Sequence, residues 1–313
     1  MKSIIKIFFL SLVLLQACDR IEAPYINEEA QNAAKGVVYL SESSVIVDGD
    51  TINFSNDNST PPKKVLAEDY TGILCGNCPV AGIKLNDTIK PGYGDRLVII
   101  SVHAGFFANP CPTGLACSGS QPAGALETDY RTPVGDAWNN FFGNSAAGNP
   151  NALIDRMEYP IRQHIKFPSV WAARIQERSV LPSKFALRIQ NIYDSSSRGL
   201  KTAIQARSIG TNNGNYKLQV VLVEDNIRDW QVWYNPTRYD PDFIHHHVLR
   251  ASVNTSFGEE IATGSVSNGQ LFLKAYNANV NASWVQEKVS VIAFVYDADT
   301  YEVLQVEELK IIP

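Results

Sequence analysis

Four cysteines in the body of the chain are the residues whose type and spacing point most clearly to chemistry. Cys75 and Cys78 form a Cys-x-x-Cys motif, and Cys111 and Cys117 enclose a five-residue loop. Two thiols at such spacing can form a structural disulfide, exchange a disulfide with another thiol, or contribute to a zinc site. The combined spacing is not that of a zinc ribbon, so no metal is expected. For Cys75 and Cys78, a redox-active pair and an inert disulfide both stay open.

The elements around Cys75 favour a reactive thiol. Residues 65–70 read as a strand and residues 81–89 as a helix, which places Cys75 at or just before a helix N-terminus. Unpaired backbone N–H groups and the helix dipole stabilise a thiolate there. Cys75 is then the attacking nucleophile, and Cys78, one turn later, is the resolving thiol.

The order of these elements resembles the thioredoxin fold. Residues 97–102 form a continuous apolar run, typical of a strand covered on both faces, so a β–α–β unit with parallel strands is expected. Asp69 stands six residues before Cys75, where thioredoxins keep a buried acid that accepts a proton from the second cysteine. Pro150 lies where they place a cis-proline that shapes the substrate groove. The resemblance therefore implies catalytic roles for Asp69, Cys75, Cys78 and Pro150.

Two observations would decide between exchange and an inert disulfide. A buried Cys75, or a trans Pro150 far from it, would count against exchange, because the attacking thiol must reach a sulfur atom. The second pair, Cys111–Cys117, is expected to form a local disulfide outside the cytosol.

The N-terminus reads as a targeting segment. Lys2 and Lys6 precede an apolar run over residues 7–15, which is too short to span a membrane but suits a signal peptide. The sequence Leu-Gln-Ala-Cys that ends at Cys18 resembles a bacterial lipobox. It predicts a signal peptide over residues 1–17 and a lipid such as palmitate on Cys18, which anchors the protein to a membrane. The alternative is an ordinary secretory signal.

Several longer strings are similar to a family of Bacteroidota lipoproteins related to outer membrane protein 28. They are residues 64–72, 75–79, 221–227, 247–250 and 303–306. The similarity implies an outer-membrane location, lipid-anchored and on either the periplasmic or the surface face. It implies no particular biochemical activity.

The length of 313 residues, of which 45% are hydrophobic, suggests two domains with ordinary cores. We expect a tether with a short hairpin over residues 18–62 and a thioredoxin-like α/β domain over residues 63–180, with a long insertion at about 104–147. Turn-separated strands then indicate an antiparallel, immunoglobulin-like β-sandwich over residues 181–313. The fold class is α+β.

Histidine and aromatic residues near position 240 suggest two further kinds of binding site. His245, His246 and His247 could bind a metal together with Asp240 or Asp242, but adjacent histidines are more often polar surface positions. Aromatic residues before them could form a stacking platform or belong to a core; they are Trp230, Trp233, Tyr234 and Tyr239.

Charge and motifs exclude several classes of function. With a net charge of −5 and no basic tract, nucleic acid is not expected as a partner. No phosphate-binding loop or catalytic triad can be placed, and no cofactor is expected. One hypothesis is thiol–disulfide exchange on exported proteins. The other is a non-catalytic binding lipoprotein, at the surface or in the periplasm, whose cysteine pairs are structural disulfides and which recognises a surface ligand.

Overall fold

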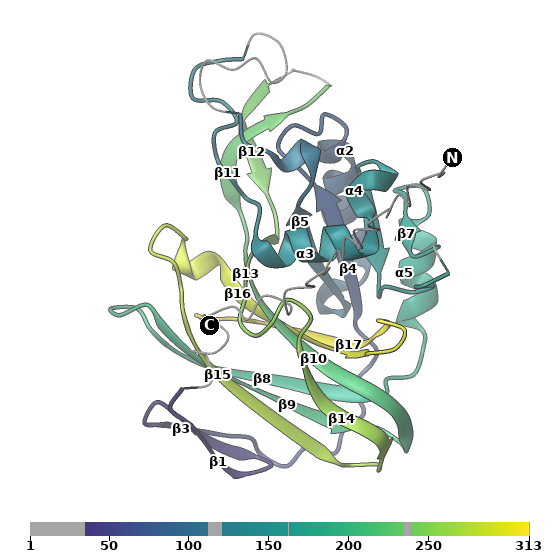
Figure 1. The fold of residues 1–313 in the computed structure, drawn as a ribbon, viewed down its shortest axis with the longest axis vertical. Coiled ribbons are helices and arrows are strands. Elements are labelled where there is room, and N and C mark those ends of the chain that lie inside the picture. The colour runs from purple at the N-terminus through teal and green to yellow at the C-terminus, as the bar shows by residue number, and fades with distance from the viewer. Residues whose placement is uncertain (1–34, 112–120, 162, 235–238, 313) are drawn as a thin grey trace, which may run out of the picture.

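The computed structural model describes residues 35–111, 121–161, 163–234 and 239–312 (Figure 1). The predicted signal peptide and Cys18 lie outside these ranges, and so does Cys117. Within them the protein has a β-rich α+β fold, built from one large mixed sheet, a second sheet packed against part of it, and two small sheets.

The first small sheet contains the predicted hairpin. Strands β2 (Ser44–Val47) and β3 (Asp50–Asn53) pair antiparallel around a tight turn, and an additional strand, β1 (Val37–Ser41), pairs with β2. Buried side chains of this sheet, such as Val47 and Ile52, pack on the second sheet. The segment predicted as a tether is therefore partly folded onto the body of the protein.

The large sheet has nine strands in the order β17-β16-β10-β13-β5-β4-β6-β7, with β14 paired to β10. Their bounds are β4 Val65–Thr71, β5 Leu97–His103, β6 Asn151–Ile154, β7 Ile165–Lys166, β10 Asn212–Glu224, β13 Val248–Ser252, β14 Glu259–Val266, β16 Val289–Asp297 and β17 Val303–Lys310.

The predicted β–α–β unit is present. Strands β4 and β5 are parallel, and every residue of β5 is buried, as its continuous apolar run indicates. Helix α2 (Cys78–Ile83) continues as a π-helix over Lys84–Ile89 and covers one face together with α5 (Trp171–Ser179). Helix α3 (Pro133–Phe142) covers the other face. Strand β6 then pairs antiparallel with β4, and β7 with β6.

Helix α3 was not predicted, although its caps are visible in the sequence. Thr132 accepts a hydrogen bond from the backbone N–H of Gly135, Pro133 is the first helical residue, and Gly143 ends the helix with a φ of 79°. Trp138 is fully buried on this helix. The remaining short helical segments are α4 Asn144–Ala147, Lys90–Gly92, Gly94–Arg96, Phe106–Ala108 and Gln286–Lys288.

The second sheet has the order β15-β9-β8 and packs on the C-terminal part of the large sheet around a shared hydrophobic core. Its strands are β8 Phe185–Asp194, β9 Gly199–Ser208 and β15 Leu271–Asn279. The large sheet runs through both predicted domains, because β13 pairs parallel with β5 at Val248 and Ser101. The backbone N–H of Ser101 also donates to the carbonyl of His247 at 2.8 Å.

A hairpin of β11 (Ile227–Val232) and β12 (Tyr239–His245) leaves this sheet between β10 and β13. In Figure 1 it lies beside the end of α2 that carries the cysteine motif. It is the element that completes the site described below.

Candidate functional site

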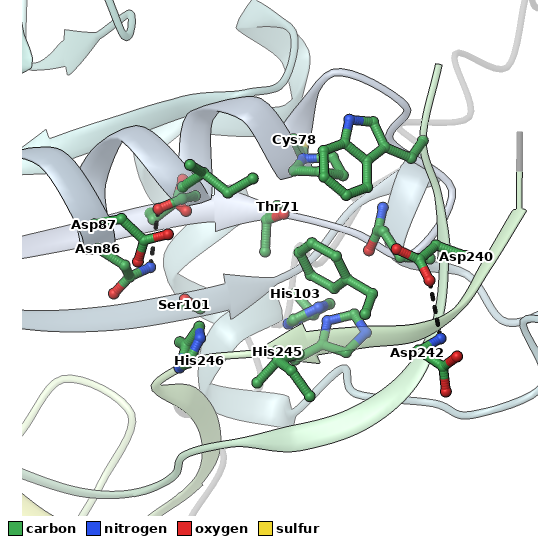
Figure 2. Close-up of a pocket in the computed structure, with 18 residues that line it drawn as sticks. Thr71, Cys78, Asn86, Asp87, Ser101, His103, Asp240, Asp242, His245 and His246 are labelled. Carbon is green, nitrogen blue, oxygen red and sulfur yellow. Dashed lines mark hydrogen bonds between the residues drawn. The ribbon is translucent and has the colours of Figure 1, made fainter. Parts of the chain in front are cut away.

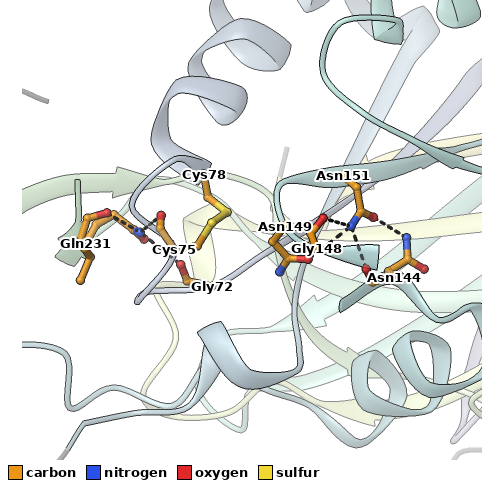
Figure 3. Close-up of a disulfide and its surroundings, with 9 residues drawn as sticks. Gly72, Cys75, Cys78, Asn144, Gly148, Asn149, Asn151 and Gln231 are labelled. Atoms are coloured by element: carbon orange, nitrogen blue, oxygen red, sulfur yellow. Dashed lines mark hydrogen bonds between the residues drawn. A yellow bond between two sulfur atoms is a disulfide. The ribbon is translucent and has the colours of Figure 1, made fainter. Parts of the chain in front are cut away.

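The predicted Cys75–Cys78 disulfide is present in the loop between β4 and α2, with an S–S distance of 2.00 Å (Figure 3). Cys78 is the first residue of α2, as the motif requires. Both cysteines are buried, with 3% of Cys75 and 4% of Cys78 exposed. Exchange requires that a thiol reach a sulfur atom, so the burial of Cys75 counts against thiol–disulfide exchange.

The β11–β12 hairpin covers the cysteine loop. The Gln231 side-chain amide donates to the carbonyl oxygens of Gly72 and Cys75, both at 3.2 Å (Figure 3). The backbone N–H of Val232 donates to the Ile73 carbonyl at 2.8 Å. The loop is thus held by residues far along the chain, a contact that no local sequence pattern indicates.

The end of the hairpin also packs closely on the motif. The backbone N–H of Tyr234 donates to the Gly76 carbonyl at 3.1 Å. A Cβ atom at Gly76 would lie 2.5 Å from the Tyr234 ring, so glycine is required for this approach. On the other side, Leu74 donates its backbone N–H to the Phe107 carbonyl at 2.9 Å.

Asp69 lies on β4 and is buried, where the thioredoxin resemblance expects a buried acid. Its Oδ1 atom has no hydrogen-bond partner among the described residues. Burial raises the pKa of the carboxyl group to about 7, because the charged form loses its solvation. Asp69 and Cys78 line the same pocket. The role of Asp69 as a proton acceptor stays a prediction.

The Asn149–Pro150 peptide bond is cis, and β6 begins at the next residue. Strand β6 pairs with β4 so that Ala152 lies opposite Asp69. In the view of Figure 3, Asn149 is drawn on the opposite side of the disulfide from Gln231. The structure thus brings Cys75, Cys78, Asp69 and the Pro150 loop to one end of the sheet, although a substrate groove at Pro150 stays a prediction.

A pocket of about 330 Å³ lies between α2, the ends of β4 and β5, and the hairpin (Figure 2). We call it the hairpin pocket. Its polar lining residues are Asp69, Thr71, Asn86, Asp87, Ser101, His103, Gln231, Asp240, Asp242, His245 and His246; its other lining residues are Cys78, Pro79, Gly82, Ile83, Trp233, Phe243 and Ile244.

Two buried histidines meet in this pocket. The ring centroids of His103 and His245 are 5.7 Å apart. Neither ring nitrogen of His103, nor Nε2 of His245, has a hydrogen-bond partner among the described residues. Burial lowers the pKa of His103 well below its usual range and that of His245 to about 4, so both imidazoles are neutral at pH 7.

Comparison with known proteins identifies the family. Residues 136–313 match the model of the family described as outer membrane protein Omp28. The chain belongs to the Omp28 family. The Omp28-family chain is therefore an outer-membrane-associated lipoprotein. The matched segment contains the hairpin, most of α3 and the second sheet, and it begins after the Cys75–Cys78 motif.

Several solved structures match parts of this Omp28-family chain. A domain of the outer membrane lipoprotein Omp28 from Porphyromonas gingivalis is 26% identical, with a TM-score of 0.29 over 41% of this chain and 88% of that one. The sporulation control protein Spo0M from Bacillus subtilis is 10% identical, with a TM-score of 0.23 over 40% and 48%. A β-glucosidase from Listeria innocua is 16% identical, with a TM-score of 0.20 over 42% and 18%. No curated protein sequence matches significantly.

The described part of this Omp28-family chain contains no helix that is long and apolar enough to cross a membrane. It also contains no cluster of three or more histidine, cysteine or acidic residues arranged to hold a metal ion. The surface interpretation of His245 and His247 is wrong, because both side chains are buried at the start of the connection to β13. Only His246 is partly exposed, and its Nδ1 lies 2.9 Å from Asp225.

The aromatic residues before the histidines have separate environments in the Omp28-family chain. Trp230 and Tyr239 pack against a buried core cluster, whereas Trp233 lines the hairpin pocket and Tyr234 is exposed over Gly76.

Cys111 is buried and disulfide-bonded. Its predicted partner Cys117 lies outside the described residues, so that pairing stays a prediction. His103 was missed by sequence analysis, because nothing near it in the chain distinguishes it from other strand residues.

Proposed function

We propose that this Omp28-family protein is a non-catalytic binding lipoprotein, anchored through Cys18, in which Cys75–Cys78 is a structural disulfide. The observation that carries the proposal is the burial of Cys75 beneath the β11–β12 hairpin. Exchange proceeds by attack of a thiolate on a disulfide sulfur, so the incoming thiol needs access that this hairpin denies.

The hairpin pocket supports a binding role. Ligand sites are concave, largely preformed and lined by apolar side chains with a few converging polar groups. The hairpin pocket has this character, with Trp233 and Phe243 beside Asp69, His103 and His245. Buried polar atoms are normally hydrogen-bonded, and a ligand in this pocket would satisfy them.

The strand arrangement supports a thioredoxin-like scaffold for residues 63–180. The order β5-β4-β6-β7 combines one parallel pair with two antiparallel pairs, and α2 connects the parallel strands. A scaffold of this kind carries many functions, since the activity depends on the site and not on the fold. The packing of the second sheet on the large one likewise supports the β-sandwich.

A second candidate is thiol–disulfide exchange, which the position of Asp69 favours. An acid with a pKa of about 7 beside Cys78 can accept the proton of its thiol when Cys78 resolves a mixed disulfide. In that reaction a donor dithiol first reduces the Cys75–Cys78 disulfide and is itself oxidised. The Cys75 thiolate then attacks a substrate disulfide, and one substrate sulfur leaves as a thiolate. The Cys78 thiolate attacks the mixed disulfide, which re-forms the Cys75–Cys78 bond and releases the reduced substrate. This candidate requires the hairpin to leave the cysteine loop.

The redox equilibrium of Cys75–Cys78 tests the proposal. The full-length protein, in detergent, would be equilibrated in thiol–disulfide buffers, alkylated and mapped by mass spectrometry. We expect a potential below about −300 mV and no alkylation of Cys75 in the native state, as for structural disulfides. A potential between about −270 and −120 mV with selective alkylation of Cys75 would instead establish exchange. Protein unfolded in denaturant is the control for alkylation.

A further inference from the structure

We propose that the hairpin pocket binds a small aliphatic polyamine or diamine. The inference rests on the proposed binding function and names the ligand class of that same site. It is carried by the distribution of charge around the pocket and by buried polar atoms that have no partner among the described residues.

Carboxylates lie at both ends of the pocket. Asp87 lies with Asn86 at the end formed by α2 and its π-helical continuation, and Asp240 and Asp242 lie at the end formed by β12 (Figure 2). Two separated anionic ends match a linear ligand that carries an ammonium group at each end. Electrostatic complementarity of this kind mainly provides selectivity between partners.

No positive charge opposes these carboxylates from inside the described part of the pocket. None of the described residues that line it is a lysine or an arginine. His103 and His245 are neutral at pH 7 because burial lowers the pKa of each. Arg228 lies 3.4 Å from Asp242, but both side chains are largely exposed and such a pair contributes little. An anionic ligand would find no charged donor among these lining residues.

The centre of the pocket offers acceptors for ammonium N–H groups. Asp69 Oδ1, both ring nitrogens of His103 and Nε2 of His245 are buried and without partners among the described residues. Figure 2 shows His103 and His245 between the two acidic ends. Each neutral imidazole keeps one nitrogen as an acceptor, and the Asp69 carboxyl group, whose pKa is about 7, becomes a carboxylate when it pairs with an ammonium group.

Apolar and aromatic side chains complete the lining. Trp233 and Phe243 lie edge to face, with ring centroids 5.9 Å apart. Aromatic faces attract ammonium groups, while Pro79, Ile83 and Ile244 suit the methylene groups between them. The volume of about 330 Å³ lies at the small end of the range for ligand pockets, which favours a compact ligand.

Isothermal titration calorimetry on the full-length protein tests the inference. The probes are putrescine and spermidine, with 1,4-butanediol as an uncharged analogue of putrescine and succinate as an anionic one. We expect saturable binding of the amines alone. Equal binding of butanediol would overturn the inference, and so would the absence of amine binding at millimolar concentration.

Substitutions of residues that line the hairpin pocket test whether the amines bind there. Asp87→Asn and Asp240→Asn lie near the surface and should each weaken amine binding about threefold, as expected for exposed charges. Asp69→Asn should weaken it at least about tenfold, because the amide oxygen still accepts but the buried negative charge that pairs with the ammonium group is lost. Glu260→Gln is the matched control, since it removes an exposed negative charge on β14, which is outside the pocket, and should leave binding unchanged.

Circular dichroism melts confirm that each variant is folded, and full amine affinity in folded Asp69→Asn and Asp240→Asn would refute the site.

The experiments distinguish a failure of the amine-binding inference from a failure of the proposed function. If amines do not bind while Cys75 stays unreactive, the ligand class is wrong and the binding-lipoprotein proposal stands. If Cys75 exchanges thiols, the proposed function is wrong whatever the calorimetry shows.

Discussion

At the scale of single residues, Asp69 is a carboxyl side chain that the fold removes from contact with water. It is buried, its Oδ1 has no hydrogen-bond partner among the described residues, and the pKa of its carboxyl group is raised to about 7. The native protein therefore keeps a proton on Asp69 between about pH 4 and pH 7, while the unfolded chain releases it. Wherever the native state binds more protons, stability falls as pH rises.

Replacing Asp69 by Asn should remove this pH-dependent loss. Relative to the wild type, the free energy of unfolding of Asp69→Asn should increase from about pH 4 to pH 7 and level off above pH 7. A pKa difference of about three units corresponds to about 4 kcal/mol at most. Urea unfolding of both proteins across this pH range measures the difference. A difference that does not change with pH would show that Asp69 titrates normally.

The residues predicted from sequence are those whose partners are close in the chain. The cysteine pair and Asp69 were found because a thioredoxin-like motif fixes their spacing over ten residues, from Asp69 to Cys78. His103 was not found as a site residue, and Trp233 was named only for a possible stacking platform, because the pocket forms only when a hairpin from the C-terminal half lies over β5. A strand pattern indicates that such residues are partly buried but not what they face.

At the scale of secondary-structure elements, the β11–β12 hairpin controls access to the cysteines. Gln231 is buried and its side-chain amide also donates to the carbonyl of Val232, so it is fixed in place above the loop. Local apolar patterns predicted β4 and β5, at residues 65–70 and 97–102. The position of a two-stranded hairpin depends on long-range packing, which local periodicity does not encode.

Gln231→Ala should loosen the cysteine loop. The Gly72 and Cys75 carbonyls would each lose one of two donors, because they also accept from the backbone N–H groups of Cys75 and Cys78; the loss of each such hydrogen bond costs about 0.5–1.5 kcal/mol in stability. Hydrogen exchange of residues 72–78 should accelerate, and reduction of the disulfide by added thiol should become faster. Gln176→Ala, at an exposed position on α5, is the control. Unchanged reduction kinetics in Gln231→Ala would contradict a covering role for the hairpin.

A second element-scale contact joins β4 to the segment after β6. The fully buried Arg156 guanidinium donates to both carboxylate oxygens of Glu68, at 2.8 and 2.6 Å. It also lies over the rings of Trp138, Phe142 and Phe294, at 4.9, 4.9 and 5.0 Å from their centroids. The planar group fills a site that an ammonium group cannot fill in the same way.

Arg156→Ala should therefore lower the free energy of unfolding by about 3–5 kcal/mol, because it leaves Glu68 charged and buried. Arg156→Lys should also destabilise, since an ammonium group lacks the planar fork that donates to both Glu68 oxygens and the flat stacking surface. Arg174→Ala, in an exposed pair with Glu177, should change stability by less than about 0.5 kcal/mol. Chemical denaturation compares the three variants, and an Arg156→Lys variant as stable as the wild type would refute the argument.

At the scale of the whole molecule, the two predicted domains share one sheet and one charged junction. Asp155 lies 2.8 Å from Lys63 and 2.9 Å from Arg178, and Arg178 also contacts Glu302 at 2.6 Å. These residues join the start of β4, the end of β6, α5 and the start of β17. Local sequence patterns predicted the elements of each half separately. They did not predict that β5 and β13 pair at Val248, because this contact joins residues far apart in the chain.

Unfolding should consequently be a single cooperative transition that involves both halves. Differential scanning calorimetry of the protein should give one peak, with the calorimetric enthalpy equal to the van't Hoff enthalpy. Tryptophan fluorescence, which reports on residues such as Trp138 and Trp171, should follow the same transition as far-UV circular dichroism. Two resolved peaks would instead show that residues 63–180 and 181–313 are independent folding units.

The burial of Cys75 by a hairpin more than 150 residues further along the chain also sets an order of events during biogenesis. An outer membrane lipoprotein is exported N-terminus first, so Cys75 and Cys78 leave the inner membrane well before Gln231 does. The disulfide must then be introduced while the cysteine loop is still open to the oxidising machinery of the periplasm. Once the hairpin is in place, the finished bond is withdrawn from oxidants and reductants alike.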